Sequence, residues 1–227
     1  MRLKHIPGSE EKIQQSPYFV ATPEQWKGSW TNLFGNDNPI HVEIGMGKGN
    51  FIIENAKRNP AINFVGIDKY PSVLVKATER LELETLPNLK LLVLDAQTIT
   101  DIFDYEISTL YLNFSDPWPK ARHYKRRLTS PIFLEKYDLI FQKNCHIVMK
   151  TDNRGLFEYS VISFTEYGYH ILNLNLNLYE IPETENIPTE YEMKFSSQGL
   201  PIYKIEVEKM TNNSKDIHKT TKKTVSK

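Results

Sequence analysis

Apolar runs that alternate with helical stretches are the feature that most constrains how this chain can fold. Residues 40–45 and 63–67 have the β-branched and aromatic content of buried strands, and a stretch with helical periodicity follows each of them. The alternation continues, with strands predicted at 89–94, 108–114, 145–149, 171–178 and 201–208, and helices at 71–86, at 131–143 and in stretches ending near Arg58 and Gly168. It predicts an α/β doubly wound fold, with about seven strands in a mostly parallel sheet and helices on both faces.

Length and composition favour one large domain. The chain has 227 residues, of which 40% are hydrophobic. No apolar run approaches the ~20 residues that a membrane-spanning helix needs. The first residues lack the apolar segment of a secretory signal, so we expect no membrane association and a cytoplasmic location. Cys145 is the only cysteine, which excludes internal disulfides and cysteine-based zinc sites, and we expect no bound metal.

A formal net charge of zero hides a difference between two parts of the chain. Residues 211–227 contain five lysines and one aspartate and so carry +4, which leaves −4 on residues 1–210. We expect 211–227 to be a disordered basic tail, 40–210 to be the folded domain, and 1–39 to be an arm with a short helix starting at Pro23. Trp26 and Trp30 lie one helical turn apart in that arm, a spacing more typical of core anchors than of a binding surface.

A glycine-rich turn joins the first predicted strand to the first long helix. Gly45, Gly47 and Gly49 let backbone N–H groups approach a ligand at the start of that helix. The dinucleotide-binding fingerprint would need a third glycine at Asn50, and a phosphate-binding P-loop would need Ser or Thr after a Gly-Lys pair. The spacing therefore excludes both of these relatives.

An acid upstream of the turn indicates the kind of ligand. Glu43 would repel a pyrophosphate but would suit a cationic or amine-bearing molecule. S-adenosylmethionine (SAM) carries a ribose, an ammonium and a sulfonium, and no phosphate. Asp68 follows Gly49 by nineteen residues, at the end of the second strand, where an acid can accept both ribose hydroxyls.

Acids also follow the later strands. Asp95, next to Ala96, could accept from an adenine amine, although a turn-forming role is nearly as compatible with the pattern. Asp116 follows the fourth strand and Asp152 the fifth, where capping of the next helix is the alternative. Because ligands of doubly wound folds gather at the carboxyl ends of strands, we expect these acids to share one site.

The segment 112–129 combines a rigid loop with a basic run. Two prolines remove backbone donors and are expected to hold Asp116 and Trp118 in extended conformations. Five cations follow within eight residues, at positions 120, 122, 125, 126 and 127. The combination suits a flat, hydrogen-bonding group beside a polyanion, and the competing interpretation is a turn followed by a solvated surface.

Several segments together resemble one family. The sequences HVEIGMGKG, GID, LDA, SDPWPKARHYKRR, KTDN and TEYEMKFSSQGLPIY closely resemble bacterial tRNA (guanine-N7-)-methyltransferases over residues 18–209. SDPWPK with its basic run, and TEYE before the last strand, are the most specific parts. TEYE also fits a capping box at a helix start. The family usually has Glu where this chain has Asp68.

The resemblance implies a Rossmann-like class I SAM-dependent methyltransferase. It would methylate N7 of guanosine 46 in the tRNA variable loop, release S-adenosylhomocysteine, and exist as a monomer or homodimer. The implied SAM contacts are Glu43, Gly45, Gly47, Gly49, Asp68, Asp95, Ala96 and Asp116, and the implied substrate contacts are Lys120, Arg122, His123, Tyr124, Lys125, Arg126, Arg127, Asp152, Thr189, Glu190, Tyr191 and Glu192.

The same resemblance makes Asp116 the catalytic residue. N7 of guanine carries a lone pair at neutral pH, so no proton must be removed, and we expect Asp116 to stabilise the charge that develops on the purine. The rival interpretations are a SAM-dependent methyltransferase with a substrate other than tRNA, and a non-catalytic RNA-binding module.

Overall fold

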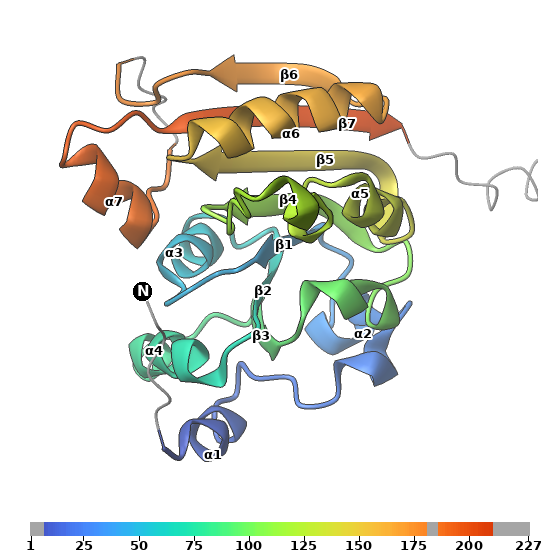
Figure 1. Ribbon diagram of the computed structural model, residues 1–227. Coiled ribbons are helices and arrows are strands. Elements are labelled where there is room, and N and C mark those ends of the chain that lie inside the picture. Colours follow the sequence, from blue (N-terminus) through green and yellow to red (C-terminus); the bar gives the residue numbers. More distant parts are fainter. Residues whose placement is uncertain (1–6, 181–185, 211–227) are drawn as a thin grey trace, which may run out of the picture.

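The computed structural model describes residues 7–180 and 186–210 of the chain, so the predicted tail and the first six residues of the predicted arm lie outside it. Its strands form one seven-stranded sheet in the order β3-β2-β1-β4-β5-β7-β6 (Figure 1). β7 is antiparallel to β5 and β6, and the other pairs are parallel. The strands are β1 Ile40–Ile44, β2 Asn63–Asp68, β3 Leu89–Val93, β4 Ile107–Asn113, β5 Phe141–Thr151, β6 His170–Asn175 and β7 Tyr203–Met210.

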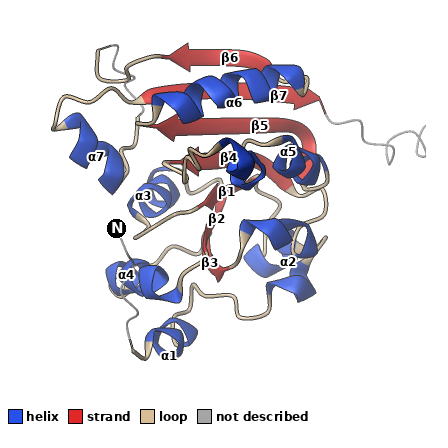
Figure 2. Cartoon of the chain, viewed as in Figure 1, coloured by secondary structure: helices blue, strands red, loops and turns tan. Residues whose placement is uncertain are grey.

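Helices cover both faces of this sheet (Figure 2). One buried cluster packs α2, α5 and α6 against the strands, and a second packs α1, α3 and α4 against the opposite face. The predicted α/β architecture is therefore confirmed. The helices are α1 Ser9–Gln14, α2 Trp30–Phe34, α3 Asn50–Arg58, α4 Pro71–Leu81, α5 Pro131–Asp138, α6 Arg154–Glu166 and α7 Glu190–Ser196, with 3₁₀ turns η1 Pro23–Trp26, η2 Ala96–Asp101 and η3 Ala121–Arg126.

The strand order places a topological switch between β1 and β4. From β1 the chain proceeds outward to β2 and β3, and then returns to place β4 on the other side of β1. Connections after neighbouring strands consequently leave to opposite faces, which opens a crevice at their carboxyl ends. The glycine turn after β1 and the proline-rich loop after β4 both lie at this crevice.

The predicted short helix starts at Pro23 as expected, but it is the 3₁₀ helix η1 and ends at Trp26, because the chain turns at Gly28. Gly28 has a φ of +75°, in the left-handed region that favours glycine, and it separates η1 from α2. The Glu106 carboxylate accepts from the N–H groups of Gly28 at 2.8 Å and Trp30 at 2.9 Å, which stabilises the turn. Trp30 is nevertheless fully buried and Trp26 packs against the same core, so both tryptophans are core anchors as expected.

Two predicted helices end early. α5 stops at Asp138 rather than at Lys143, because the Ile140 carbonyl accepts from two N–H groups at the start of β4 and the chain enters β5 at Phe141. α4 stops at Leu81 rather than at residue 86. There the Tyr18 hydroxyl donates to the Glu84 carbonyl at 2.5 Å and accepts from the N–H of Leu86 at 3.2 Å. These two hydrogen bonds stabilise a non-helical turn.

Residues 172–178 alternate leucine with asparagine, a pattern typical of a strand near the edge of a sheet, and β6 does lie at the edge. This alternation does not bury one apolar face, because Ile171, Leu172 and Leu174 are all exposed. The pairing with β7 shifts register between Ile171 and Asn173, where a β-bulge interrupts the alternation.

Candidate active site

The glycine turn leaves β1 through three residues with positive φ. Gly45, Gly47 and Gly49 have φ of +79°, +58° and +79°, in the left-handed region that favours glycine. A Cβ at Gly45 or Gly47 would meet nothing within 4 Å, whereas one at Gly49 would lie 2.9 Å from the Cβ of Ala77. The first two positions thus present bare backbone to open space, and the third is needed for close packing of α3 against α4.

Asp68 binds this turn directly. Its Oδ2 accepts from the N–H of Gly47 at 3.1 Å and its Oδ1 accepts from the N–H of Tyr70 at 3.0 Å. Burial raises the pKa of Asp68, although the backbone donors oppose that shift. The predicted ribose acceptor at the end of β2 is therefore held against the glycine turn.

Asp95 has the turn-forming role that was its alternative interpretation. Its Oδ1 accepts from the N–H of Gln97 at 3.0 Å and caps η2, whose first residue is Ala96. Lys69 donates to its Oδ2 at 2.6 Å and lowers the pKa of Asp95. The contact with an adenine amine remains a prediction for this side chain.

Two buried acceptors near the end of β1 and β4 lack donors. Glu43 is 1% exposed; its Oε1 accepts from Nδ2 of Asn113 at 2.8 Å, while its Oε2 has no partner among the described residues. The Oδ1 of Asn113 is likewise buried without a partner among those residues. Burial raises the pKa of Glu43 to about 7. Buried oxygens without donors are expensive unless a ligand supplies hydrogen-bond donors.

A buried lysine at the end of β5 was not predicted from the sequence. Lys150 is 3% exposed and its Nζ donates to Glu192 Oε2 at 2.6 Å, forming an ion pair with a fully buried carboxylate. The ammonium also lies 5.1 Å from the centre of the Phe51 ring. Its place at the end of an apolar strand, as the first residue of KTDN, was the only signal for it in the sequence.

The TEYE segment forms the predicted capping box. Thr189 accepts from the N–H of Glu192 at 3.0 Å, and the Glu192 carboxylate accepts from the N–H of Thr189 at 3.3 Å. Glu190 pairs with Lys48 of the glycine turn at 2.9 Å and also with Arg80 of α4. Tyr191 is exposed and stacks on Phe114, with ring centres 6.3 Å apart.

The loop after β4 has a conformation that its prolines did not predict. Trp118 has a φ of +42° and Phe114 a φ of +52°, so the expected extended conformation of Trp118 is wrong. Arg127 explains the difference, because its Nε donates to the Pro117 carbonyl and its Nη2 donates to the Trp118 carbonyl, both at 3.1 Å. Its guanidinium also lies 4.2 Å from the centre of the Tyr159 ring. Arg127 is thus engaged in holding the loop.

Asp116 lies on this loop with an exposed carboxylate for which the described residues supply no hydrogen bond or ion pair. The Arg126 guanidinium covers the indole of Trp118 at 4.8 Å, and the ring of His123 meets that indole edge-on at 5.8 Å. The remaining members of the basic run are exposed on or beside η3; they are Lys120, Arg122, Tyr124 and Lys125.

The structure also separates the two polar residues after β5. Asn153 caps α6, its Oδ1 accepting from the N–H of Leu156 at 2.8 Å. Asp152 is half-buried and takes no part in the cap, so it stays a candidate for substrate binding.

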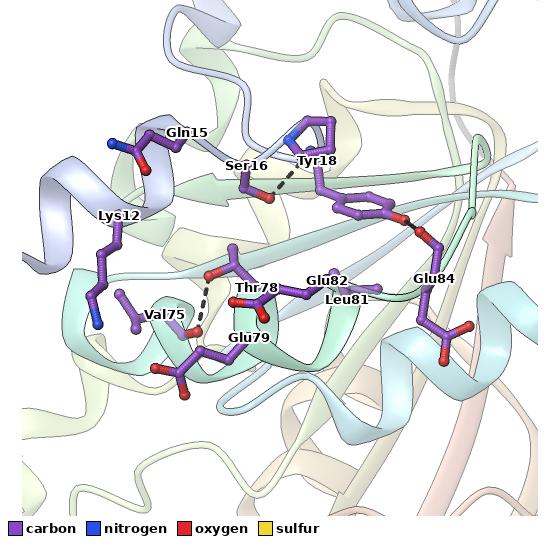
Figure 3. A pocket seen from close by; sticks show the side chains of 11 residues that line it. Lys12, Gln15, Ser16, Tyr18, Val75, Thr78, Glu79, Leu81, Glu82 and Glu84 are labelled. Atoms are coloured by element: carbon purple, nitrogen blue, oxygen red, sulfur yellow. Dashed lines mark hydrogen bonds between the residues drawn. The ribbon is translucent and has the colours of Figure 1, made fainter.

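A separate groove of about 470 Å³ lies between α1 and α4 (Figure 3). Lys12, Tyr18, Glu79 and Glu84 are among the residues that line it, and Tyr18 points across it to the Glu84 carbonyl. The predicted site residues do not line this groove. Within the described ranges, there is no helix long and apolar enough to cross a membrane and no cluster of side chains suited to a metal ion.

The family model Methyltransf_4, described as "Putative methyltransferase", matches residues 37–205. The tRNA (guanine-N(7)-)-methyltransferase of Geobacillus sp. (strain WCH70) is 51% identical over 209 residues, 91% of this chain and 95% of that relative. The enzyme of the same description from Bacillus subtilis (strain 168) is 49% identical over 210 residues, 92% of this chain and 99% of the relative.

Solved structures of low identity share the fold. The crystal structure of the 16S rRNA methyltransferase KamB matches with a TM-score of 0.63 at 14% identity, and the match covers 81% of this chain and 93% of the KamB chain. A variant of the 16S rRNA (adenine(1408)-N(1))-methyltransferase from Catenulisporales acidiphilia, solved with its cosubstrate SAM, matches with a TM-score of 0.55 at 13% identity. That match covers 85% of this chain and 92% of the other chain. The fold is that of the class I SAM-dependent methyltransferases.

Proposed function

Because this chain belongs to the bacterial tRNA (guanine-N7-)-methyltransferase family and is thus a tRNA guanine-N7 methyltransferase, we propose that it transfers the methyl group of SAM to N7 of guanosine 46 in the tRNA variable loop. The reaction occurs in the cytoplasm, where tRNA is available, and the enzyme acts as a monomer or homodimer. Residues 40–210 form the catalytic domain, and α1 and α2 of the preceding segment pack into its two core clusters.

The buried acceptors of Glu43 and Asn113 carry the proposal for the methyl donor. The unpartnered Oδ1 of Asn113 can only accept a hydrogen bond, and so can the Glu43 carboxylate once it is ionised, which suits an ammonium and disfavours a phosphate. Gly45 and Gly47 offer the bare backbone that such a ligand can approach. Asp68 adds a carboxylate for ribose hydroxyls, and Asp95 with Ala96 borders the adenine. The residues present therefore fit SAM, which supplies a methyl group on a sulfonium when bound.

Asp116 is the residue proposed to act on the reacting base. Guanine N7 needs no deprotonation, so a general base is not required at this position. An exposed carboxylate on a loop held by Arg127 is available to accept from guanine N1–H and N2–H and to stabilise the positive charge that develops on the purine. In this proposal Asp116 both binds the guanine and stabilises the charge of the transition state.

The exposed cations around η3 are proposed to bind the tRNA backbone. Lys120, Arg122, Lys125 and Arg126 contact phosphates, and His123, Tyr124 and Trp118 provide rings beside a base that must leave its stack. Arg127 contributes by fixing the loop rather than by a phosphate contact. Asp152 and the segment 189–192 border the guanine on the other side, where Tyr191 already stacks on Phe114.

Mapping of N7-methylguanosine tests the function. tRNA from cells lacking the protein is expected to resist chemical cleavage at guanosine 46, and the purified protein with labelled SAM is expected to restore the cleavage. A tRNA with adenosine at that position serves as the control. Cleavage that persists without the protein, or labelling of the control tRNA, would contradict the assigned substrate.

The Asp116→Asn variant tests the catalytic assignment. We expect its single-turnover rate at saturating tRNA and SAM to fall at least about a hundredfold, the scale observed when one preorganised electrostatic group is removed. Because the carboxylate is exposed and has no partner among the described residues, the melting temperature should not change. A rate close to that of the wild type would show that Asp116 has no catalytic role.

A further inference from the structure

All three hydrogen bonds of the buried Lys150 ammonium go to one short segment. Nζ donates to the Asn186 side chain at 3.1 Å, to the Ile187 carbonyl at 2.9 Å and to Glu192 at 2.6 Å. We call residues 186–192 the cover segment. The Glu192 carboxylate is tied further within the segment, since its Oε1 accepts from the Asn186 amide at 2.6 Å. The Lys150 ammonium thus binds residues at both ends of the cover segment and holds them at the end of β5.

The cover segment then contacts the elements that build the proposed donor site. The Asn50 amide at the start of α3 donates to the Pro188 carbonyl at 2.9 Å. Glu190 pairs with Lys48 of the glycine turn and Tyr191 stacks on Phe114, two residues before Asp116. Figure 1 shows the same arrangement, with α7 beside α3 at the edge toward which the β5 arrow points.

We propose that Lys150 is a positioning residue for methyl transfer, which fastens the cover segment across the glycine turn and thereby holds the donor site closed. The inference rests on the proposed function and adds a role for a residue outside the predicted site. Closing a site in this way excludes water from the donor and orders the groups on both sides of the reaction.

Burial distinguishes Lys150 from the other two cations that pair with the cover segment, Lys48 and Arg80. Lys48 and Arg80 are substantially exposed, so their pairs with Glu190 lie in a screened environment and hold the segment weakly. The Lys150–Glu192 pair is almost fully buried, with 3% and 0% exposure of the two side chains. Removal of one member leaves an uncompensated buried charge, which strongly destabilises the arrangement around it. The fastening of the segment therefore depends on Lys150.

The Lys150→Met variant provides the first measurement. We expect the dissociation constant for SAM, measured by calorimetry, to rise at least tenfold. Lys76→Met is the matched control, because Lys76 forms an exposed ion pair with Glu79 on α4 and should leave SAM binding unchanged. A folded Lys150→Met protein that binds SAM within twofold of the wild type would overturn the proposal.

A second variant separates positioning from simple stability. Lys150→Met/Glu192→Gln removes both charges, and the glutamine oxygen can still accept from the N–H of Thr189 in the capping box. We expect this double variant to recover most of the melting temperature that Lys150→Met loses, while SAM affinity stays reduced at least fivefold. Recovery of wild-type SAM affinity together with the melting temperature would show that Lys150 is only structural.

Hydrogen exchange tests the fastening without any donor or tRNA. In the free protein, amides of α7 should exchange at least tenfold faster in the double variant than in the wild type, while those of β4 stay unchanged. An equal exchange rate of α7 would contradict the fastening by Lys150. A wild-type protein that fails to bind SAM would instead contradict the proposed function, so the two failures are distinguishable.

Discussion

Replacement of Glu43 by glutamine should remove a large pH dependence of folding. The Glu43 carboxyl is buried, and its burial raises the pKa from 4.5 to about 7 in the folded chain, with the Asn113 hydrogen bond opposing the shift. Between these two values the folded chain keeps a proton that the unfolded chain releases. The contribution of Glu43 to stability is therefore fully present below pH ~4.5 and is lost as the pH rises through about 7.

The magnitude follows from the same two pKa values. One unit of pKa difference corresponds to about 1.4 kcal/mol, so between pH 5 and pH 8 the titration of Glu43 lowers the free energy of unfolding by roughly 2 to 3 kcal/mol. Glutamine is neutral throughout and can keep the hydrogen bond from Asn113. In Glu43→Gln, the loss of stability between pH 5 and pH 8 should thus be smaller by that amount than in the wild type.

Urea unfolding followed by circular dichroism at the two pH values measures this difference. Glu54→Gln is the matched control, because it makes the same chemical change at an exposed position, where Glu54 pairs with Arg58 on α3. Binding of SAM provides a second readout: an ammonium next to Glu43 favours the ionised carboxylate, so the affinity of the wild type should rise from pH 6 to pH 8. Equal pH slopes for Glu43→Gln and the wild type would refute the reasoning.

Three further results follow from other parts of the molecule. Arg126→Met should raise the KM for tRNA without changing the melting temperature. Arg127→Met should instead lose about 2 kcal/mol of stability, because it removes two hydrogen bonds to backbone carbonyls. Thermal melts and kinetics that show the opposite pattern would contradict these separate roles of Arg126 and Arg127. Gly49→Ala should cost at least about 2 kcal/mol in urea unfolding, because of its positive φ and the close Cβ of Ala77, while Gly155→Ala should be neutral or slightly stabilising. The affinity for tRNA should fall steeply as salt rises from 50 to 200 mM, by roughly tenfold or more for several phosphate contacts, and a flat salt dependence in filter binding would exclude a phosphate-binding role for η3.

The sequence predicts well what local patterns determine. The strand ends carrying Glu43, Asp68 and Asp116 follow from apolar runs that stop at polar residues, and the capping box of α7 follows from the spacing of Thr189 and Glu192. These features depend on residues within a few positions of one another. That is the range over which periodicity and capping rules apply.

Features set by distant partners were not predicted. The end of α5 depends on hydrogen bonds from the start of β4 to the Ile140 carbonyl, and the left-handed conformation of Trp118 depends on Arg127. Lys150 looks like any lysine after a strand, because the carboxylate that makes its burial tolerable lies 42 residues away in the chain. Only the folded arrangement brings such charges together.

The bulge in β6 has a consequence for the behaviour of the protein in concentrated solution. An exposed edge strand offers unpaired backbone groups to other chains, and Ile171, Leu172 and Leu174 add an apolar surface to that edge. The irregular register between Ile171 and Asn173 bends the strand and interrupts the straight row of donors and acceptors that another strand would need. A local irregularity in one strand thereby protects a leucine-rich edge against aggregation.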